Sequence, residues 1–190
     1  MSKIRFGTDG WRAIIAKEYT VANVARVSIA VSSWLNKNYS NPVVVLGHDC
    51  RFGGELFAQT VAKVLSEHNI KVKMAKGFVS TPMVSLGVVK ESASLGVVIT
   101  ASHNPPTYNG YKLKGDFGGP LLPENVSEVE NLIPENNNID LDKISFQSIV
   151  DSSMVEIIDL EKKISTENEQ PKFIGEELKK RQYLSGLSIE

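Results

Sequence analysis

The apolar residues of this chain follow two periods, one typical of helices and one typical of strands. Over Thr20–Asn38 they recur at every third or fourth position, which predicts an amphipathic helix capped by Thr20. A second helical pattern starts at Gly54 and ends near Asn69, a residue that tolerates the left-handed backbone of a helix end. A third helix is expected from Thr81 to about Glu91, with Thr81 as its cap.

Short apolar runs separate these helices and predict strands. Val43–Leu46 and Leu95–Ile99 are compact apolar runs, as expected for buried parallel strands. Over Ile70–Met74, apolar residues alternate with lysines, and Asn109–Lys114 adds a turn and a strand. Strands that alternate with helices of this length form βαβ units, which build a mostly parallel sheet and gather ligands at the loops that follow the strands.

The character of the chain changes at Pro134. Residues 1–133 hold 14 Lys and Arg against 10 Asp and Glu, whereas the remainder holds 7 basic against 12 acidic residues. Beyond Pro134 short apolar pieces alternate with acids, and Phe173–Leu184 is expected to form one more helix. We expect one domain over residues 1–150, followed over 151–190 by a lead-in segment and tail rather than a second complete domain.

Composition and charge exclude several classes of protein. The 190 residues are 42% hydrophobic and 23% charged, which is typical of a globular protein. A formal net charge of −1 gives no general attraction to nucleic acid or to an anionic membrane, so neither is an expected partner. No apolar run approaches the roughly 18 residues of a membrane span. The single cysteine, Cys50, allows no internal disulfide, so a cytoplasmic location is expected.

The loop after Leu95–Ile99 carries the best candidate for chemistry. It reads Thr-Ala-Ser-His-Asn-Pro-Pro and presents Ser102 at the carboxyl end of a predicted strand. Three interpretations are open: a turn rich in hydrogen-bonding residues, a hydrolase nucleophile beside His103, or a serine that carries a phosphoryl group. The hydrolase ranks last, because the glycines of a nucleophile elbow are absent and His103 is poorly aimed at its neighbour's hydroxyl.

Two other segments offer cations suited to a phosphate. The Gly-rich segment Phe6–Arg12 ends in an arginine, whose planar guanidinium matches phosphate oxygens. Lys112, in the Asn109–Lys114 turn and strand, offers a compact positive charge. A phosphoryl group on Ser102 needs such donors and cations around it.

Several nearby residues have structural alternatives. Three roles are open for Arg51: contact with a substrate, an ion pair with Asp49, or capping of a neighbouring helix. Lys114 is expected to be solvated, and Trp11 to serve packing only.

Taken together, these loops resemble the first domain of the α-D-phosphohexomutases, which include phosphoglucomutase, phosphomannomutase and phosphoglucosamine mutase. The resemblance covers about residues 3–133. It lies in five segments that follow one another in the family's order: Phe6–Arg12, Gly47–Arg51, Gly77–Pro82, Thr100–Pro105 and Asn109–Leu113. It implies a three-layer α/β/α domain with a mixed, mostly parallel sheet.

The resemblance also implies a reaction. In the family the serine that matches Ser102 is phosphorylated at rest, passes its phosphoryl group to a hexose phosphate and regains one from the resulting bisphosphate. Phosphate thereby moves between C1 and C6. By the same resemblance Arg12 binds phosphate, His103 is a site histidine and Lys112 assists proton transfer, as suits a reaction that needs charge neutralisation. The further phosphate-binding residues expected are Thr100, Asn104 and Arg51.

The family's magnesium site is only partly represented in this sequence. In the family a Mg²⁺ ion joins the phosphoserine to three aspartates of an Asp-Gly-Asp-x-Asp-Arg loop in the second domain. No segment here matches that loop, since Asp140-Leu141-Asp142 lacks its glycine and its arginine. The phosphate on Ser102 would be the one metal ligand, too few for Mg²⁺.

We therefore expect an isolated first domain, without domains II–IV, that binds no Mg²⁺ and has negligible mutase activity alone. A hexose 1,6-bisphosphate is the expected activator of the full-length enzyme. The substrate is expected to be a hexose phosphate, with glucose or mannose favoured because glucosamine-type members tend to have isoleucine where Trp11 stands. The alternative is a non-catalytic module of the same fold that holds a sugar phosphate or a partner.

Overall fold

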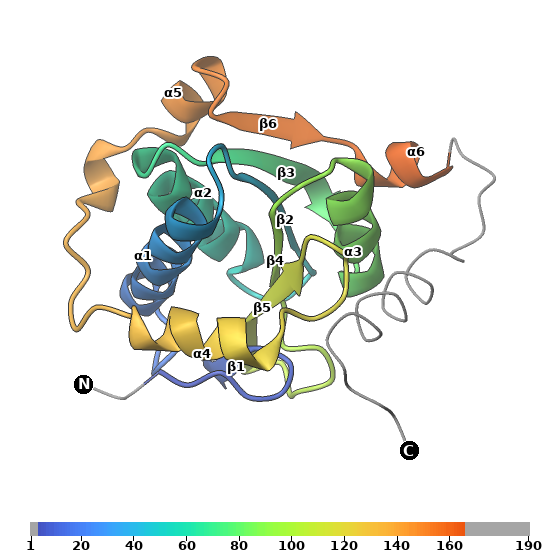
Figure 1. Ribbon diagram of the computed structural model, residues 1–190. Helices are drawn as coiled ribbons and strands as arrows, with labels where there is room; N and C mark the ends of the chain where they lie inside the picture. The colour runs from blue at the N-terminus through green and yellow to red at the C-terminus, as the bar shows by residue number, and fades with distance from the viewer. Residues whose placement is uncertain (1–3, 166–190) are drawn as a thin grey trace.

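Six β-strands form one mixed sheet in the computed structural model, which describes residues 4–165 (Figure 1). The strands are β1 (Trp11–Ile14), β2 (Val43–His48), β3 (Lys71–Phe78), β4 (Leu95–Ile99), β5 (Tyr108–Gly115) and β6 (Val155–Ile158). Their order across the sheet is β1-β5-β4-β2-β3-β6. Strands β4, β2, β3 and β6 run parallel, whereas β5 is antiparallel to both of its neighbours. The predicted mixed, mostly parallel sheet is confirmed.

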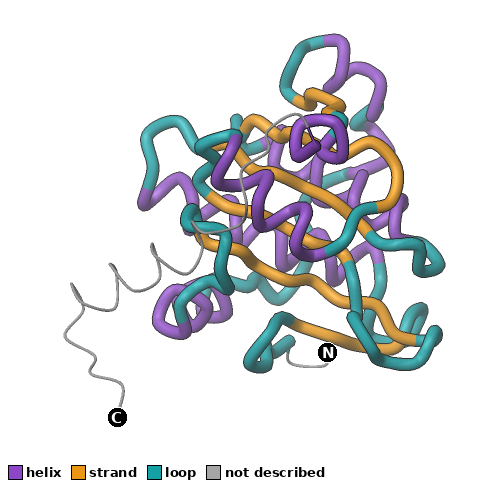
Figure 2. The backbone as a smooth tube through the Cα atoms, turned by 90° about the vertical axis from the view of Figure 1, so that its right-hand side faces the viewer, coloured by secondary structure: helices purple, strands orange, loops and turns teal. Residues whose placement is uncertain are grey.

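Helices cover both faces of this sheet, which crosses the middle of the molecule in Figure 2. They are α1 (Val21–Asn38), α2 (Gly54–Glu67), α3 (Thr81–Lys90), α4 (Pro123–Asn131), α5 (Phe146–Asp151) and α6 (Leu160–Ser165), with a short 3₁₀ helix over Leu141–Lys143. Helices α1, α2, α4 and α5 contribute to the apolar core on one face, and α3 and α6 to the core on the other. The three-layer α/β/α architecture is therefore confirmed.

Local signals determine where the helices begin and end. The Thr20 hydroxyl accepts a hydrogen bond from a backbone N–H three residues on, at 3.2 Å, which confirms Thr20 as the N-cap of α1. After α2, Asn69 adopts the predicted left-handed backbone, with φ of 59°. At α3 the predicted cap is wrong by one residue: Ser80 is the N-cap, because Thr81 already occupies the first helical position.

Strand β1, at one edge of the sheet, is not predicted by the apolar pattern. It is held there by aromatic packing: Trp11 stacks on Tyr19 with ring centroids 4.7 Å apart, and the Tyr19 ring meets Phe57 edge-on. The Tyr19 hydroxyl also donates to the carbonyl oxygen of Gly110 in β5, at 2.7 Å. The packing role expected of Trp11 is confirmed, and this cluster ties β1 to β5.

The sheet continues past the domain boundary expected at residue 150. Strand β6 pairs in parallel with β3, and Val155 lies opposite Val72. Three residues of this extension are buried: Val155, Ile158 and Leu160. Residues 155–160 thus pack as part of the same unit as the rest of the described chain, and the division at residue 150 stays a prediction.

The helix predicted over Phe173–Leu184 lies outside the described residues. Within residues 4–165, no helix is both long enough and apolar enough to cross a membrane.

The burial of Leu160 makes the contribution of the β6–α6 segment measurable. Leu160 packs in the core between α3 and the sheet, so Leu160→Ala is expected to lower the free energy of unfolding by about 2–5 kcal/mol. The matched control, Leu56→Ala, truncates a half-exposed leucine on α2 and is expected to change it by less than about 0.5 kcal/mol. Urea unfolding checks both values. Equal midpoints for Leu160→Ala and the unmodified chain would contradict the assignment of α6 to this core.

Candidate active site

The loop that carries Ser102 connects the carboxyl end of β4 to the start of β5. It lies beside the loop that follows β2, because β2 and β4 are neighbours in the sheet. The backbone N–H of Asp49 donates to the carbonyl oxygen of Ile99 at 3.1 Å, which joins the two loops at their bases. The expected gathering of these loops at one edge of the sheet is therefore present.

Ser102 is exposed at the surface of this loop and its backbone is left-handed, with φ of 56°. A left-handed backbone costs a non-glycine residue about 1–3 kcal/mol, and the residue keeps this conformation only when its surroundings enforce it. Such residues are common at functional sites. The conformation of Ser102 therefore depends on contacts from neighbouring residues.

The Arg51 side chain, which follows β2, holds the Ser102 loop by its carbonyl oxygens. Nη2 donates to Ser102 O at 2.8 Å and to Asn104 O at 2.7 Å. Nη1 donates to Pro105 O at 2.9 Å and to Tyr108 O at 3.1 Å. One planar guanidinium thus fixes four backbone carbonyls, and we call this set of four bonds the Arg51 clamp.

Among the possibilities left open for Arg51, pairing with Asp49 is confirmed, since Arg51 Nε lies 3.4 Å from Asp49 Oδ2. The helix-capping alternative is wrong, because every hydrogen bond that the guanidinium donates within residues 4–165 ends on the Ser102 loop or on the first residue of β5. Direct contact between Arg51 and a phosphate stays a prediction. In this conformation the four Nη–H donors are all engaged, so the arrangement gives Arg51 a positioning role.

Asp49 and Thr100 form the second support of the loop. The buried Thr100 hydroxyl donates to Asp49 Oδ2 and accepts a hydrogen bond from the Ser102 backbone N–H at 3.0 Å. The other Asp49 oxygen accepts from the Arg51 backbone N–H at 3.0 Å. The backbone of Ser102 is thus linked to Arg51 on both sides, through its carbonyl and through its N–H. Whether Thr100 also binds phosphate stays a prediction.

Three cationic side chains lie on one face of the sheet next to this loop. Trp11 and Ala13 point into the core under α1, so Arg12 between them faces the opposite side, where α3 packs. On β5, Lys112 and Lys114 lie opposite Val98 and Gly96 of β4, and Val98 belongs to the core under α3. The two-residue period of the strands therefore places Arg12, Lys112 and Lys114 on the same face.

A single carboxylate lies among these three cations. Asp9 Oδ2 contacts Lys112 Nζ and lies 3.5 Å from Arg12 Nη2, while Asp9 Oδ1 lies 3.8 Å from Lys114 Nζ. The lysine side chains are only 4% and 7% exposed, against 39% for Asp9. Lys114 was expected to be solvated, and this expectation is wrong because β5 is covered on this face and Lys114 turns inward with Lys112.

Arg12 also connects this face to the Ser102 loop. Its Nη1 donates to the side-chain oxygen of Asn104 at 3.0 Å, two residues beyond Ser102. Arg12, Lys112, Asn104 and Ser102, which the sequence singled out separately, thus belong to one connected set. Sequence reasoning did not single out Asp9, and the alternation along β5 was the signal that could have placed Lys114 beside Lys112.

The electrostatics of Lys114 reflect this burial. Desolvation lowers the pKa of Lys114, the Asp9 carboxylate opposes that change, and the Lys112 ammonium lowers the pKa further. Two ammonium groups on alternate residues of one strand repel each other, and Asp9 is the carboxylate within reach of both in the described part of the chain. Asp9 therefore offsets the cost of holding two buried lysines on one face.

Two glycines allow the segments to approach closely. Gly10, before β1, has φ of 97°, and a Cβ there would lie 2.6 Å from the carbonyl oxygen of Tyr111. At Gly110 a Cβ would lie 2.5 Å from the carbonyl oxygen of Thr100. A side chain at either position would push the Asp9 segment or the Ser102 loop away from β5.

His103 is exposed beside Ser102. Within residues 4–165 the Ser102 hydroxyl makes no hydrogen bond to a histidine, so the described geometry lacks the nucleophile–base pair of a serine hydrolase. The same part of the chain contains no group of three or more His, Cys, Asp or Glu side chains that could hold a metal ion. The residues present therefore do not form a Mg²⁺ site by themselves.

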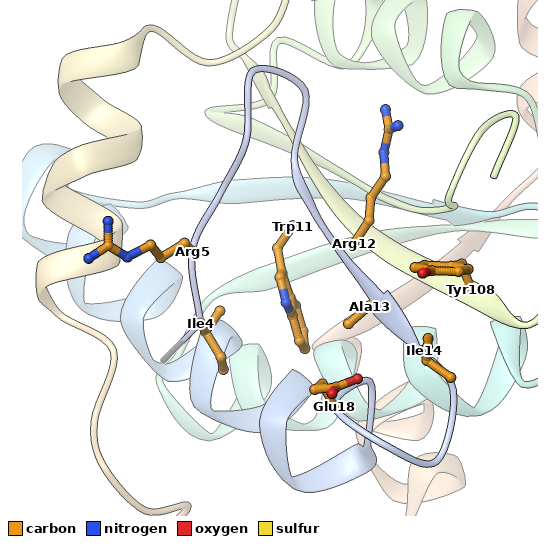
Figure 3. Close-up of a pocket in the computed structure, with 8 residues that line it drawn as sticks. All are labelled: Ile4, Arg5, Trp11, Arg12, Ala13, Ile14, Glu18 and Tyr108. Carbon is orange, nitrogen blue, oxygen red and sulfur yellow. The ribbon is translucent and has the colours of Figure 1, made fainter. Parts of the chain in front are cut away.

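A pocket of about 380 Å³ lies along β1 and shares Arg12 with the cationic face (Figure 3). In the figure the Arg12 side chain points away from the Trp11 ring, so the two residues extend to different sides of the strand. Ser102, His103 and Lys112 do not line this pocket. This pocket and the Ser102 loop are therefore separate features that share the Arg12 side chain with the cationic face.

Comparison with protein families and curated proteins gives consistent matches. A family model described as phosphoglucomutase/phosphomannomutase, alpha/beta/alpha domain I, matches residues 3–140. A phosphoglucomutase of Staphylococcus saprophyticus is 32% identical over 178 residues, which cover 90% of this chain and 32% of that protein. A phosphoglucosamine mutase of Halalkalibacterium halodurans is 36% identical over 132 residues, which cover 70% of this chain and 29% of that protein. The chain thus spans about a third of the length of these relatives.

Solved structures agree with these matches. A Thermus thermophilus protein assigned as a phosphomannomutase superposes with a TM-score of 0.73 at 36% identity, over 84% of this chain and 34% of that one. The Paramecium phosphoprotein pp63/parafusin superposes with a TM-score of 0.64 at 19% identity, over 75% of this chain and 28% of that one, and this likeness concerns the fold alone.

The Arg51 clamp predicts which amides lose protection when it is removed. In Arg51→Ala, and in Arg51→Lys, whose ammonium cannot span four carbonyls, hydrogen exchange of the Ser102, Asn104 and Tyr108 amides is expected to rise by about tenfold or more. Exchange of the amides in β2 is expected to stay slow. Hydrogen-exchange mass spectrometry of peptides over residues 101–109 checks this.

The matched control for the clamp is Arg26→Ala. It removes a guanidinium that also donates to a carbonyl oxygen, that of Pro134 at 2.7 Å, on the α1 face of the sheet. This variant is expected to leave the Ser102 loop unchanged. Unaltered exchange over residues 101–109 in Arg51→Ala would show that the loop does not depend on the clamp.

Proposed function

Because this chain belongs to the phosphoglucomutase/phosphomannomutase family, in which it matches the α/β/α domain I, we propose that Ser102 carries the phosphoryl group in a phosphohexomutase reaction. The observation that supports this most is the placement of Ser102. The residue is exposed at the carboxyl ends of the parallel strands, in a strained backbone held by the Arg51 clamp, and its loop is bonded to the cationic Arg12. A serine that must pass a phosphoryl group to a sugar and take one back needs this combination.

The reaction consists of two phosphoryl transfers in opposite directions. In the first, the bond between phosphorus and Ser102 Oγ breaks as phosphorus bonds to a free hydroxyl oxygen of the hexose phosphate, and the proton of that hydroxyl is transferred to Ser102 Oγ. In the second, the bond between phosphorus and the sugar oxygen at the other end of the resulting bisphosphate breaks as phosphorus bonds to Ser102 Oγ, and the Oγ proton is transferred to the freed sugar oxygen. Phosphate has then moved between C1 and C6, and Ser102 is phosphorylated again. In the transition state negative charge is spread over the oxygens of the transferred group and builds on the leaving oxygen, and fixed cations placed around these atoms stabilise it.

The residues of this chain have separate roles in that scheme. Arg12 neutralises phosphate charge, and its bond to Asn104 keeps the guanidinium beside the Ser102 loop. Lys112, buried to 4% exposure, presents a fixed positive charge and assists proton transfer. His103 is exposed next to the serine, where it can contact an incoming sugar phosphate. Arg51 and Thr100 act as positioning residues, because both are bonded to the loop itself.

We propose Mg²⁺ as a cofactor and a hexose 1,6-bisphosphate as an activator for the whole enzyme only. The described residues contain no cluster of metal ligands, so the other oxygens around a metal bound to a Ser102 phosphate would have to come from outside residues 4–165. The bisphosphate would serve to phosphorylate Ser102. Bound to the Ser102 phosphate, Mg²⁺ would offset negative charge on the transferred phosphoryl group.

The proposed substrates are hexose phosphates, with glucose or mannose phosphate favoured. The relatives include a phosphoglucomutase and a phosphoglucosamine mutase, so the family likeness alone does not select the sugar. Because the chain spans about a third of these relatives, we propose that it supplies the phosphoserine loop and has negligible turnover without the other domains. A cytoplasmic location suits the exposed free thiol of Cys50.

A second candidate is a non-catalytic module that holds a sugar phosphate. The arrangement of Arg12, Lys112 and Lys114 around Asp9 supports it, because this cationic cluster involves no atom of Ser102. Such a module would bind phosphate without passing it to the serine. The two candidates therefore differ in the effect of removing the Ser102 hydroxyl.

A domain exchange tests the proposal. Residues 1–140 of this chain replace the matched domain of the Staphylococcus saprophyticus phosphoglucomutase, and conversion of glucose 1-phosphate to glucose 6-phosphate is measured with Mg²⁺ and glucose 1,6-bisphosphate. The chimera is expected to turn over, and Ser102→Ala is expected to reduce turnover by about 10³-fold or more, as for loss of a catalytic nucleophile. The 190-residue chain alone is expected to show none.

Ser92→Ala is the matched control, because Ser92 is another exposed serine with a left-handed backbone, φ of 48°, at the opposite end of β4. It is expected to leave turnover within about twofold, as for a surface change away from the site. A folded, active chimera in which Ser102→Ala has no more effect than Ser92→Ala would contradict the proposed role of Ser102.

A further inference from the structure

Asp9 occupies the position where three cations of this domain converge. Its two carboxylate oxygens lie against Lys112, Arg12 and Lys114, and within residues 4–165 it is the only carboxylate within 4 Å of either lysine. Three cations and one carboxylate leave a formal charge of plus two. The cluster is therefore under-neutralised in the state that the structure describes.

The two lysines cannot move away from this point as surface lysines can. Both side chains are nearly buried, and the stem of Lys114 is packed against β4, where a Cβ on Gly96 would lie 3.1 Å from the Lys114 Cβ. Asp9, by contrast, is 39% exposed and lies in a segment that follows Gly7 and precedes the left-handed Gly10. The cations are fixed, and the anion is the part that can be displaced.

From this geometry we infer that Asp9 is a resident anion in a phosphate-binding site, that a phosphoryl dianion displaces it, and that Lys114 is a third cation of that site beside Arg12 and Lys112. The inference rests on the proposed function in one respect: the phosphoryl group would be that of phosphoserine 102 or of the sugar phosphate. The charge of the phosphoryl group also fits this site, because a phosphate dianion carries two negative charges and the cluster carries a formal charge of plus two.

The presence of the Asp9 carboxylate explains how the site stays ordered when no phosphate is bound. Two buried ammonium groups without a counter-ion would repel each other and disfavour the folded state. Asp9 prevents this before phosphate binds, and the anion that replaces it takes over the same contacts. Asp9 therefore lowers the affinity for phosphate, whereas Lys114 raises it.

The opposite signs of these two effects provide the test. Thermal unfolding is measured in potassium phosphate and in NaCl of equal ionic strength, in the Ser102→Ala background, so that no phosphoserine can form. Asp9→Asn is expected to lower the unfolding temperature in NaCl, because the cations lose their counter-ion. It is also expected to bind phosphate about tenfold or more tightly than the parent, seen as a larger upward shift at each phosphate concentration.

Control variants separate this effect from the loss of any ion pair. Asp140→Asn breaks an exposed pair with Lys143, whose charged atoms are 2.9 Å apart, and is expected to leave the phosphate shift unchanged. Lys114→Met removes the buried charge with little change in volume and is expected to reduce phosphate affinity about tenfold without lowering the unfolding temperature in NaCl. Lys143→Met is its surface control and is expected to have no effect.

Two results would overturn the inference. One is an Asp9→Asn protein that folds and whose phosphate shift equals or falls below that of the parent, since Asp9 would then be a structural counter-ion only. The other is a Lys114→Met protein with unchanged phosphate affinity, which remains measurable even where Asp9→Asn does not fold. Neither result depends on turnover, so an inactive chimera with a tighter-binding Asp9→Asn would reject the mutase function and retain the phosphate site.

Discussion

One guanidinium joins the two loops on which the proposed chemistry depends. Arg51 lies in the loop after β2, and its Nη groups bind three carbonyl oxygens in the loop after β4 and a fourth, that of Tyr108, at the start of β5. Carbonyls at an exposed loop would otherwise be hydrated and free to change direction, and Ser102 could relax from its left-handed backbone. Because the bonds go to the backbone rather than to side chains, they fix the path of the loop and leave the side chains of Ser102 and His103 free for a ligand.

The second constraint is the two-residue period of the strands. It turns Trp11 and Tyr111 into the core under α1 and turns Arg12 and Lys112 to the other face, beside the Ser102 loop. The same alternation carries apolar packing on one side of the sheet and positive charge on the other. A substitution that shifted the register of β1 against β5 by one residue would turn Trp11 out of the core and Arg12 away from the Ser102 loop, so core packing and the placement of Arg12 depend on the same register.

Much of the fold was predictable because its signals are local. The helix from Val21 to Asn38, its cap at Thr20 and the buried strands β2 and β4 follow from periodicity and from one capping residue. Strand β1 was not predictable from its four residues, since its position depends on pairing with β5 about a hundred residues further along the chain. Strand β6 was missed for the same reason, because what defines it is its partner β3.

Some residues of the candidate site were likewise predictable from local sequence, whereas others depend on contacts between distant segments. The exposed serine loop and the cations at residues 12 and 112 could be selected from their sequence surroundings. The clamp could not, because Arg51 is separated by 51 to 57 residues from the carbonyls that it binds. Asp9 was overlooked and Lys114 was wrongly expected to be solvated, because an aspartate and a strand lysine show no special pattern in the sequence until the sheet brings them together.

The proposed function requires residue 102 to hold its phosphoryl group among fixed cations. A ³¹P NMR titration of the chain with phosphoserine incorporated at position 102, compared with phosphoserine at position 92, measures whether it does. The second pKa of free phosphoserine is about 6. The second pKa of the phosphoserine is expected to be lower by about one unit or more at position 102 than at position 92, because nearby cations favour the dianion. Equal values at the two positions would contradict the proposed function.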